Sequence, residues 1–169
     1  MEIRKATAAD HETILAIYAR ARQYMAQNGN PTQWGLTNWP PEDLVREDIA
    51  AGNSYVCVHE NRVVGVFYYV CGPDIEPTYG TIESGTWLDS SPYGVIHRIA
   101  TDGSVKGVAR FCFEWALQQC PHLRIDTHPD NKIMLNLLPE FGFSRRGIIH
   151  IVEDDCPRIA FEIPATKQL

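Results

Sequence analysis

The sequence predicts one α+β domain of three-layer type, in which helices cover both faces of a mixed, mostly antiparallel sheet of about seven strands. Three observations predict this class. Segments with strand-like and helix-like apolar spacing alternate along the chain. Residues 93–101 are apolar on both faces, which is typical of a central strand covered by helices. The 169 residues, 44% of them apolar, are enough for one domain with a sizeable core.

Composition and charge exclude several classes of protein. The net charge of −6 and the isoelectric point of about 5.4 argue against a nucleic-acid partner, whose footprint would be basic. No uninterrupted apolar stretch approaches about 18 residues, so we expect no segment that spans a membrane. The opening segment lacks the apolar core of a signal peptide, and the five cysteines show no CxxC spacing. We therefore expect a cytoplasmic protein with free thiols and no metal site.

The chain begins with a strand, two helices and a hairpin. Asp10 can cap the first helix, because apolar residues then recur on one face as far as Met25. Pro40-Pro41 can begin the second helix, since proline is tolerated in a first turn. Glu60-Asn61 joins two strand-like runs as a two-residue hairpin turn. The expected elements are a strand at 2–7, helices from Asp10 to Asn28 and from Pro40 to Gly52, and strands at 54–59 and 62–71.

Residues 72–92 form a long irregular excursion, after which strands and helices alternate. Excursions of this length in compact domains tend to be functional or mobile. Pro139 should end or distort the last helix, and Gly142 should adopt a left-handed conformation after it. Hairpins combined with two strand–helix crossovers make the sheet mixed. The expected elements are a strand at 93–101, a helix from about Lys106, a strand at 122–128, a helix from about Asp130, and a closing hairpin of 143–152 and 158–163.

The most informative segment is Ile99–Ala109, where a buried strand runs through a glycine-rich turn into a helix. Small residues at the start of a helix let a ligand approach the backbone closely. Exposed N–H groups and the positive end of the helix dipole favour an anion there, and Lys106 and Arg110 would add positive charge. The segment therefore indicates a phosphate site, and the alternative is an ordinary strand-to-helix turn that needs its glycines.

Residues 94–150, which include this segment, resemble the core of the GNAT superfamily of acyl-CoA-dependent N-acyltransferases. In that family the pattern [QR]-x-x-G-x-[GA] follows a strand and grips the pyrophosphate of coenzyme A through backbone N–H groups. Here Gly107 and Ala109 match the two small positions, and Ser104 stands where Gln or Arg is usual. The resemblance implies acetyl-CoA as the co-substrate. It implies that the acyl-CoA is held by Ser104, Lys106, Gly107, Val108 and Ala109, and its thioester carbonyl by a backbone N–H of the strand carrying Ile99, Ala100 and Thr101.

A second match is the segment from Asn131 to Phe143, which resembles the family's N-x-x-A-x-x-x-Y-x-x-x-G-F helix. Asn131 and Gly142-Phe143 match, and the resemblance implies that Asn131 bonds the pantetheine or pyrophosphate arm. In the family the tyrosine would protonate the departing thiolate. Leu138 occupies that position, so the usual general acid is missing.

Candidates for the proton transfers lie in the two central strands. Acylation of an amine needs a base, for which His97 and His128 are candidates because a histidine titrates near neutral pH. Asp126 could orient one of them. The other reading is a buried network that fixes the strand register, in which Asp126 is the counter-charge of Arg98 or His97.

The acceptor pocket should be formed by the loop between the first two helices, the 72–92 excursion and the final hairpin. Trp34, Tyr79, Glu83 and Trp87 suggest an aromatic wall with one carboxylate, which suits an ammonium group. The alternative is that the tryptophans pack the sheet. The acidic run Glu153-Asp154-Asp155 is interpreted as a solvated turn.

The leading hypothesis is an acetyl-CoA-dependent N-acetyltransferase, spanning residues 1–169, that acts on a primary amine of a small molecule or peptide by direct attack. The alternative is an acyl-CoA-binding sensor or regulatory module without turnover, and the leucine at position 138 is its main support. The expected partner is the amine, with no nucleic acid and no membrane. The sequence leaves open whether the protein is a homodimer.

Overall fold

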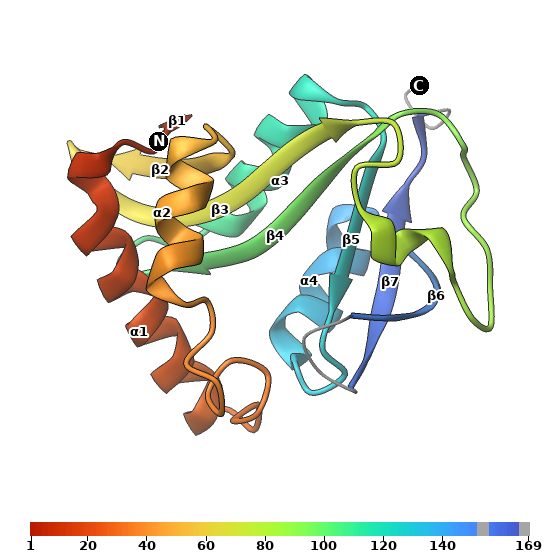
Figure 1. Cartoon of the computed structure of the whole chain (residues 1–169), viewed down its shortest axis with the longest axis horizontal. Coiled ribbons are helices and arrows are strands. Elements are labelled where there is room, and N and C mark those ends of the chain that lie inside the picture. The colour runs from red at the N-terminus through yellow and green to blue at the C-terminus, as the bar shows by residue number, and fades with distance from the viewer. Residues whose placement is uncertain (152–155, 166–169) are drawn as a thin grey trace. The chain divides into compact units, whose positions relative to one another are not determined.

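The computed structural model describes residues 1–151 and 156–165, in which seven strands form one mixed sheet of order β1-β2-β3-β4-β5-β7-β6 (Figure 1). β4 and β5 pair in parallel, and the pairs β1–β2, β2–β3, β5–β7 and β6–β7 are antiparallel. The predicted α+β fold class is confirmed. The strands are β1 (Glu2–Lys5), β2 (Ser54–His59), β3 (Arg62–Gly72), β4 (Tyr93–Thr101), β5 (Leu123–Thr127), β6 (Ser144–His150) and β7 (Pro157–Ile163), and the helices are α1 (His11–Gln27), α2 (Glu42–Ala50), α3 (Val108–Gln119) and α4 (Lys132–Phe141).

The chain forms two compact units. Unit 1 comprises Met1–Tyr69 and His97–Trp115, and unit 2 comprises Val70–Ile96 and Ala116–Leu169. Three elements, β3, β4 and α3, contribute residues to both units. None of the helices in the described residues is long and apolar enough to span a membrane.

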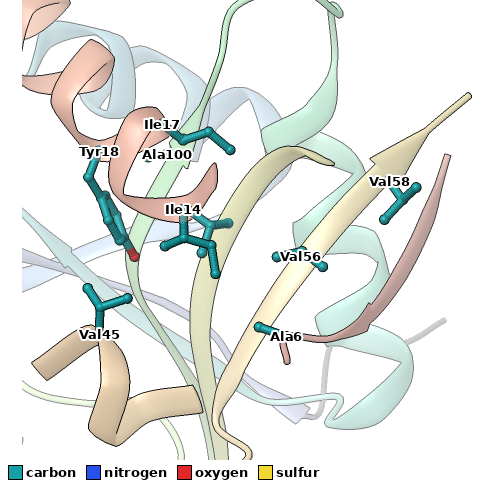
Figure 2. Close-up of a cluster of buried hydrophobic side chains, with 9 residues drawn as sticks. Ala6, Ile14, Ile17, Tyr18, Val45, Val56, Val58 and Ala100 are labelled. Atoms are coloured by element: carbon teal, nitrogen blue, oxygen red, sulfur yellow. The ribbon is translucent and has the colours of Figure 1, made fainter. Parts of the chain in front are cut away.

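In unit 1, helices cover both faces of the sheet. On one face α1 and α2 lie over β2 and β3, and a cluster of nine buried side chains fills the space between them (Figure 2). Each of its larger aliphatic side chains stabilises the fold by roughly 1.5–3 kcal/mol. On the other face Trp115 of α3 packs on Tyr55 and Phe67, with ring centroids 4.9 and 5.7 Å apart. A Cβ on Gly65 would lie 2.6 Å from Val108, so the glycine lets α3 approach β3 closely.

Unit 2 contains a fully buried carboxylate, Glu162 on β7. It accepts hydrogen bonds from His122 Nε2 at 2.9 Å, from the Leu88 N–H at 2.7 Å and from Arg124 Nε at 3.3 Å. Burial alone raises the pKa of Glu162, but these hydrogen bonds and the nearby positive charge outweigh it, so the pKa lies below its ordinary value. The guanidinium of Arg124 is also held between the rings of Trp87 and Tyr93, 4.3 and 4.1 Å from their centroids.

The 72–92 excursion is joined to β6 through its backbone. The N–H and C=O of Glu83 bond to those of Ile148 at 2.8 and 2.9 Å. Two glycines make this approach possible. A Cβ on Gly85 would lie 1.7 Å from the Arg146 carbonyl oxygen, and one on Gly147 would lie 2.5 Å from the Glu83 carbonyl oxygen.

Most of the expected elements are confirmed to within a few residues. The hairpin turn has φ of 49° at Glu60 and 61° at Asn61, as a two-residue turn of the primed type requires. Gly142 ends α4 with φ of 117°, whereas Pro139 lies inside this helix rather than ending it. All five cysteines are free in the structure. The expected acidic turn at Glu153–Asp155 lies outside the described residues.

Asp10 occupies the N-cap position of α1, as predicted, but its carboxylate does not cap the helix. Its carboxylate instead accepts two hydrogen bonds from the Arg4 guanidinium, both of 2.8 Å, and one from the Thr7 N–H, also of 2.8 Å. The hydrogen bonds from Arg4 hold the pKa of Asp10 well below its ordinary value, although burial opposes the shift. Asp10 therefore ties β1 to the 3₁₀ turn that precedes α1.

Candidate active site

The loop between β4 and α3, residues 102–107, has the backbone of an anion cradle. Gly103 and Gly107 have φ of 75° and 80°, a region that disfavours residues with a Cβ, and open space surrounds both. The Asp102 carboxylate accepts hydrogen bonds from the N–H and hydroxyl of Ser104 at 2.8 and 2.6 Å, which fixes the turn. Ser104, Lys106 and Gly107 are exposed. The first N–H groups of α3, which have no partner within a helix, follow directly.

The other residues expected around this loop have distinct surroundings. Val108 is buried against β3, so it can contribute only its backbone to a ligand, and Ala109 is half-buried. Ala100 is part of the buried cluster of unit 1, whereas Ile99 and Thr101 are half-buried. The exposed, open loop with a lysine fits a diphosphate group, because the ligand can reach the main chain without displacing a side chain.

Strand β4 changes its backbone conformation at Arg98, whose φ is 51°. A left-handed residue inside a strand breaks the alternation of its side chains, and such irregularities often occur next to active sites. The Tyr18 hydroxyl donates to the Arg98 carbonyl oxygen at 3.1 Å, which ties α1 to this point of the strand. Burial raises the pKa of Tyr18, so this hydroxyl keeps its proton to donate. Ile99, Ala100 and Thr101 directly follow the irregular residue.

Asp126 was expected to pair with Arg98 or with His97, and for Arg98 the structure shows a different partner. Arg98 Nη2 donates to Asp48 Oδ2 of α2 at 2.6 Å, and the guanidinium lies 4.6 Å from the centroid of the Tyr68 ring. Burial raises the pKa of Asp48, and the charges of Arg98 and His97 act in the opposite direction. The His97 ring lies 6.0 Å from that of Tyr68. Asp48 and Tyr68 are therefore additional polar residues beside the irregular part of β4.

In unit 2 the structure joins Asp126 to Tyr79. The Tyr79 hydroxyl donates to Asp126 Oδ2 at 2.8 Å, and Trp87 Nε1 donates to the Tyr79 carbonyl oxygen at 2.9 Å. Burial, then the neighbouring charge of Asp126, raise the pKa of Tyr79 well above its ordinary value. A pocket of about 410 Å³ in unit 2 is lined by Tyr79 and Trp87, with Arg124 contributing a positive charge. The guanidinium of Arg124 thus covers one face of the Trp87 ring.

The remaining predicted substrate-binding residues, Glu83 and Trp34, lie in different surroundings. Glu83 is exposed, with its carboxylate 3.4 Å from His150 Nε2. Trp34 is half-buried, packs against the cluster of unit 1 and meets Tyr18 edge-on at 5.8 Å.

At the end of β5 and the start of α4, Asn131 caps the helix by accepting a hydrogen bond from the Met134 N–H at 3.2 Å. Leu138, at the position of the family's tyrosine, is fully buried. His128 is buried and lies 3.1 Å from the sulfur of Cys156. Sequence reasoning missed this cysteine, because the two residues are 28 positions apart and only the pairing of β5 with β7 brings them together.

Comparison with solved structures identifies the fold. An acetyltransferase of the GNAT family from Streptococcus agalactiae is 26% identical, with a TM-score of 0.85 over 95% of this chain and 93% of that one. A GNAT-family acetyltransferase from Listeria monocytogenes has a TM-score of 0.67 at 16% identity, over 96% and 94% of the two chains. Ribosomal-protein-alanine N-acetyltransferase from Brucella melitensis has a TM-score of 0.63 at 18% identity, over 96% and 99%. No family model and no curated protein matches the sequence.

The chain has the fold of GNAT-family acetyltransferases, and Gly107, Ala109 and Asn131 are the residues that resemble the motifs of that family.

Proposed function

We propose that the protein is an acetyl-CoA-dependent N-acetyltransferase that acetylates a primary amine of a small molecule or peptide by direct attack. The observation that carries the proposal is the loop at Gly103–Gly107, which has left-handed glycines, open space beside them and a helix N-terminus directly after them. The names of the structural neighbours support transfer of an acetyl group.

The loop would hold the pyrophosphate of acetyl-CoA. Backbone N–H groups at Gly107, Val108 and Ala109 would donate to its oxygens, and the dipole of α3 would favour the negative charge. Lys106 and Ser104, both exposed, would add contacts from their side chains. Asn131 would contact the pantetheine arm through its side-chain amide.

The segment after Arg98 would polarise the thioester. A backbone N–H within Ile99–Thr101 would donate to the carbonyl oxygen, which becomes negatively charged as the amine attacks. The Asp48 and Tyr18 contacts to Arg98 hold this part of the strand in its irregular conformation. Such fixed donors stabilise developing charge without having to reorganise.

The proton transfers would use His97 as the base, with Asp126 as an orienting carboxylate; His128, the other candidate, already accepts the Asp130 N–H at Nδ1 and directs Nε2 at the Cys156 sulfur. The amine nitrogen bonds to the carbonyl carbon, the carbon–sulfur bond of the thioester breaks, and the base takes a proton from the amine. The departing thiolate takes a proton from water, because position 138 supplies no acid. Trp34, Tyr79, Glu83 and Trp87 remain the proposed acceptor residues, with the exposed carboxylate of Glu83 attracting an ammonium group. The five free cysteines support the expected cytoplasmic location.

A matched pair of glycines tests the cradle. Gly29, after α1, has φ of 82° and open space like Gly107, but it lies outside the loop. Gly107→Glu should weaken acetyl-CoA binding, measured by calorimetry, at least about tenfold through charge repulsion at the helix N-terminus. Gly29→Glu, which imposes the same backbone strain, should leave the affinity unchanged. Equal affinities for both variants and the parent would refute the cradle.

The alternative function, an acyl-CoA sensor without turnover, is favoured by the buried Leu138. A panel of primary amines, incubated with acetyl-CoA and followed by mass spectrometry of acetylated products, separates the two functions. Formation of an acetylamine that His97→Ala slows supports the enzyme. Tight acetyl-CoA binding with no product across the panel supports the sensor.

A further inference from the structure

Cys156 and His128 form a close thiol–imidazole pair in unit 2. The Cys156 sulfur lies 3.1 Å from His128 Nε2. His128 directly follows β5 and Cys156 directly precedes β7, and the antiparallel pairing of Thr127 with Ile159 brings these ends together. The Arg158 guanidinium donates to the Cys156 carbonyl oxygen at 3.1 Å, which anchors the backbone of the cysteine.

The main chain determines which nitrogen of His128 carries the proton. The N–H of Asp130 donates to Nδ1 at 3.1 Å, so Nδ1 must accept. A neutral imidazole then holds its proton on Nε2, and the Nε2–H is directed at the sulfur. Because His128 is only 4% exposed, its neighbours hold the ring in this orientation.

A hydrogen-bond donor directed at sulfur stabilises the thiolate more than the thiol, and the thiolate is the nucleophilic form. In many covalent catalysts the paired histidine takes the proton of the nucleophile, whereas here Nε2 already carries a proton, so His128 acts on Cys156 as a hydrogen-bond donor and not as its base. Cys156 is also partly exposed, whereas Cys57 and Cys112 are fully buried. We propose that Cys156 is a nucleophilic thiol, held ready by His128, that accepts an acyl group from a thioester.

The reaction is an exchange of thioesters. Cys156 loses its proton to solvent, and its thiolate, which accepts the Nε2–H of His128, bonds to the carbonyl carbon. The carbon–sulfur bond of the donor breaks, and the departing thiolate takes a proton from water. No oxidant or reductant is needed. The inference rests on the proposed function only in taking acetyl-CoA as the natural donor, and the acylated cysteine is an additional acceptor that direct attack by the amine does not require.

The test compares Cys156 with exposed Cys71 in the folded full-length chain. Each thiol is labelled with limiting iodoacetamide and quantified by peptide mass spectrometry, with rates normalised to those in the urea-unfolded chain. Cys156 should react about tenfold faster than Cys71 on this scale. Labelling at equal or lower normalised rate would overturn the proposal.

Two substitutions of His128 test the role of the ring. His128→Asn keeps an acceptor for the Asp130 N–H but removes the donor to sulfur, so the rate advantage should vanish. His128→Gln places an amide N–H near the sulfur and should retain most of it. Circular dichroism verifies that each variant is folded. Where a variant does not fold, the labelling rates of Cys156 and Cys71 in the wild-type protein still test whether Cys156 is unusually reactive. An advantage that persists in His128→Asn would overturn the proposed pair.

The acyl step is tested with S-acetyl-N-acetylcysteamine, a thioester without the nucleotide. Acetylation of Cys156, absent in Cys156→Ser and reversed by hydroxylamine, is the expected result. A thiol that alkylates rapidly but is not acetylated would overturn the acyl-acceptor role. Because this donor does not use the Gly107 cradle, its outcome is independent of whether the chain binds acetyl-CoA.

Discussion

Arg98 takes a left-handed backbone conformation in the middle of β4, and its guanidinium donates at 2.6 Å to the carboxylate of Asp48 on α2. The side chains of the two residues are only 15% and 13% exposed. Burial raises the pKa of Asp48 despite this pairing, so the pair is costly to desolvate. Its structural value therefore lies in fixing the strand conformation that precedes Ile99–Thr101.

Replacing Asp48 with asparagine should destabilise the protein. The buried guanidinium loses its counter-charge, and its Nε already lacks a hydrogen-bond partner among the described residues. We expect the free energy of unfolding in urea to fall by roughly 2–3 kcal/mol. The neighbouring, exposed Glu47→Gln is the control and should change it by less than about 0.5 kcal/mol. Similar values for the two variants would contradict the role assigned to the pair.

The Arg4–Asp10 pair should stabilise the protein in a pH-dependent way. The folded-state pKa of Asp10 is lowered, so its contribution is fully present above the unfolded pKa of about 3.9 and is lost as the pH falls from there toward the folded pKa. Asp10→Asn should cost about 1 kcal/mol at pH 7, since Arg4 is partly exposed. Urea unfolding at pH 7, 3 and 2 should show the difference between the two proteins narrowing only below about pH 4. A constant difference would contradict the assignment.

Glu162→Gln should be the most damaging of these substitutions. It removes the charge that Arg124 and His122 share in the core, and the expected loss is roughly 3–5 kcal/mol of unfolding free energy. Exposed Glu140→Gln is the matched control. Thermal unfolding followed by circular dichroism measures both, and a Glu162 variant as stable as the control would show that the network does not support the fold.

Restoring the tyrosine of the family at position 138 should not create a general acid. Leu138 is fully buried, so Leu138→Tyr overfills the core and should cost roughly 1–3 kcal/mol of stability. Ile133→Tyr, at an exposed position of the same helix, should be nearly neutral. Acetylation rates measured at a temperature where both variants are folded should show no gain for Leu138→Tyr, and an increase would mean that the hydroxyl reaches the reacting atoms.

Structural features that depend only on residues adjacent in the sequence could be predicted from the sequence. Glu60-Asn61 specifies a two-residue turn, and Gly142 specifies the end of α4, because both requirements are conformations of single residues. The glycines of the cradle were recognisable for the same reason. The class of the fold followed from the order of such elements.

Contacts between distant residues could not be predicted in this way. The mid-strand charge of Arg98 indicated that a partner exists, but Asp48 is 50 positions away and is chosen by how α2 packs on the sheet. The sequence did indicate that Asp48 faces the sheet, because Asp48 lies on the same helical face as the buried Val45. His128 and Cys156 depend in the same way on strand pairing, and neither residue signals the other locally.

The backbone bonds between Glu83 and Ile148 also bear on self-association. β6 is the last strand of the sheet, and an unprotected last strand offers its main-chain groups to a strand of a second molecule. The excursion already occupies those groups at Ile148, and Gly85 and Gly147 allow it to lie against β6. A strand of a second molecule could therefore pair with β6 at Ile148 only by displacing the excursion.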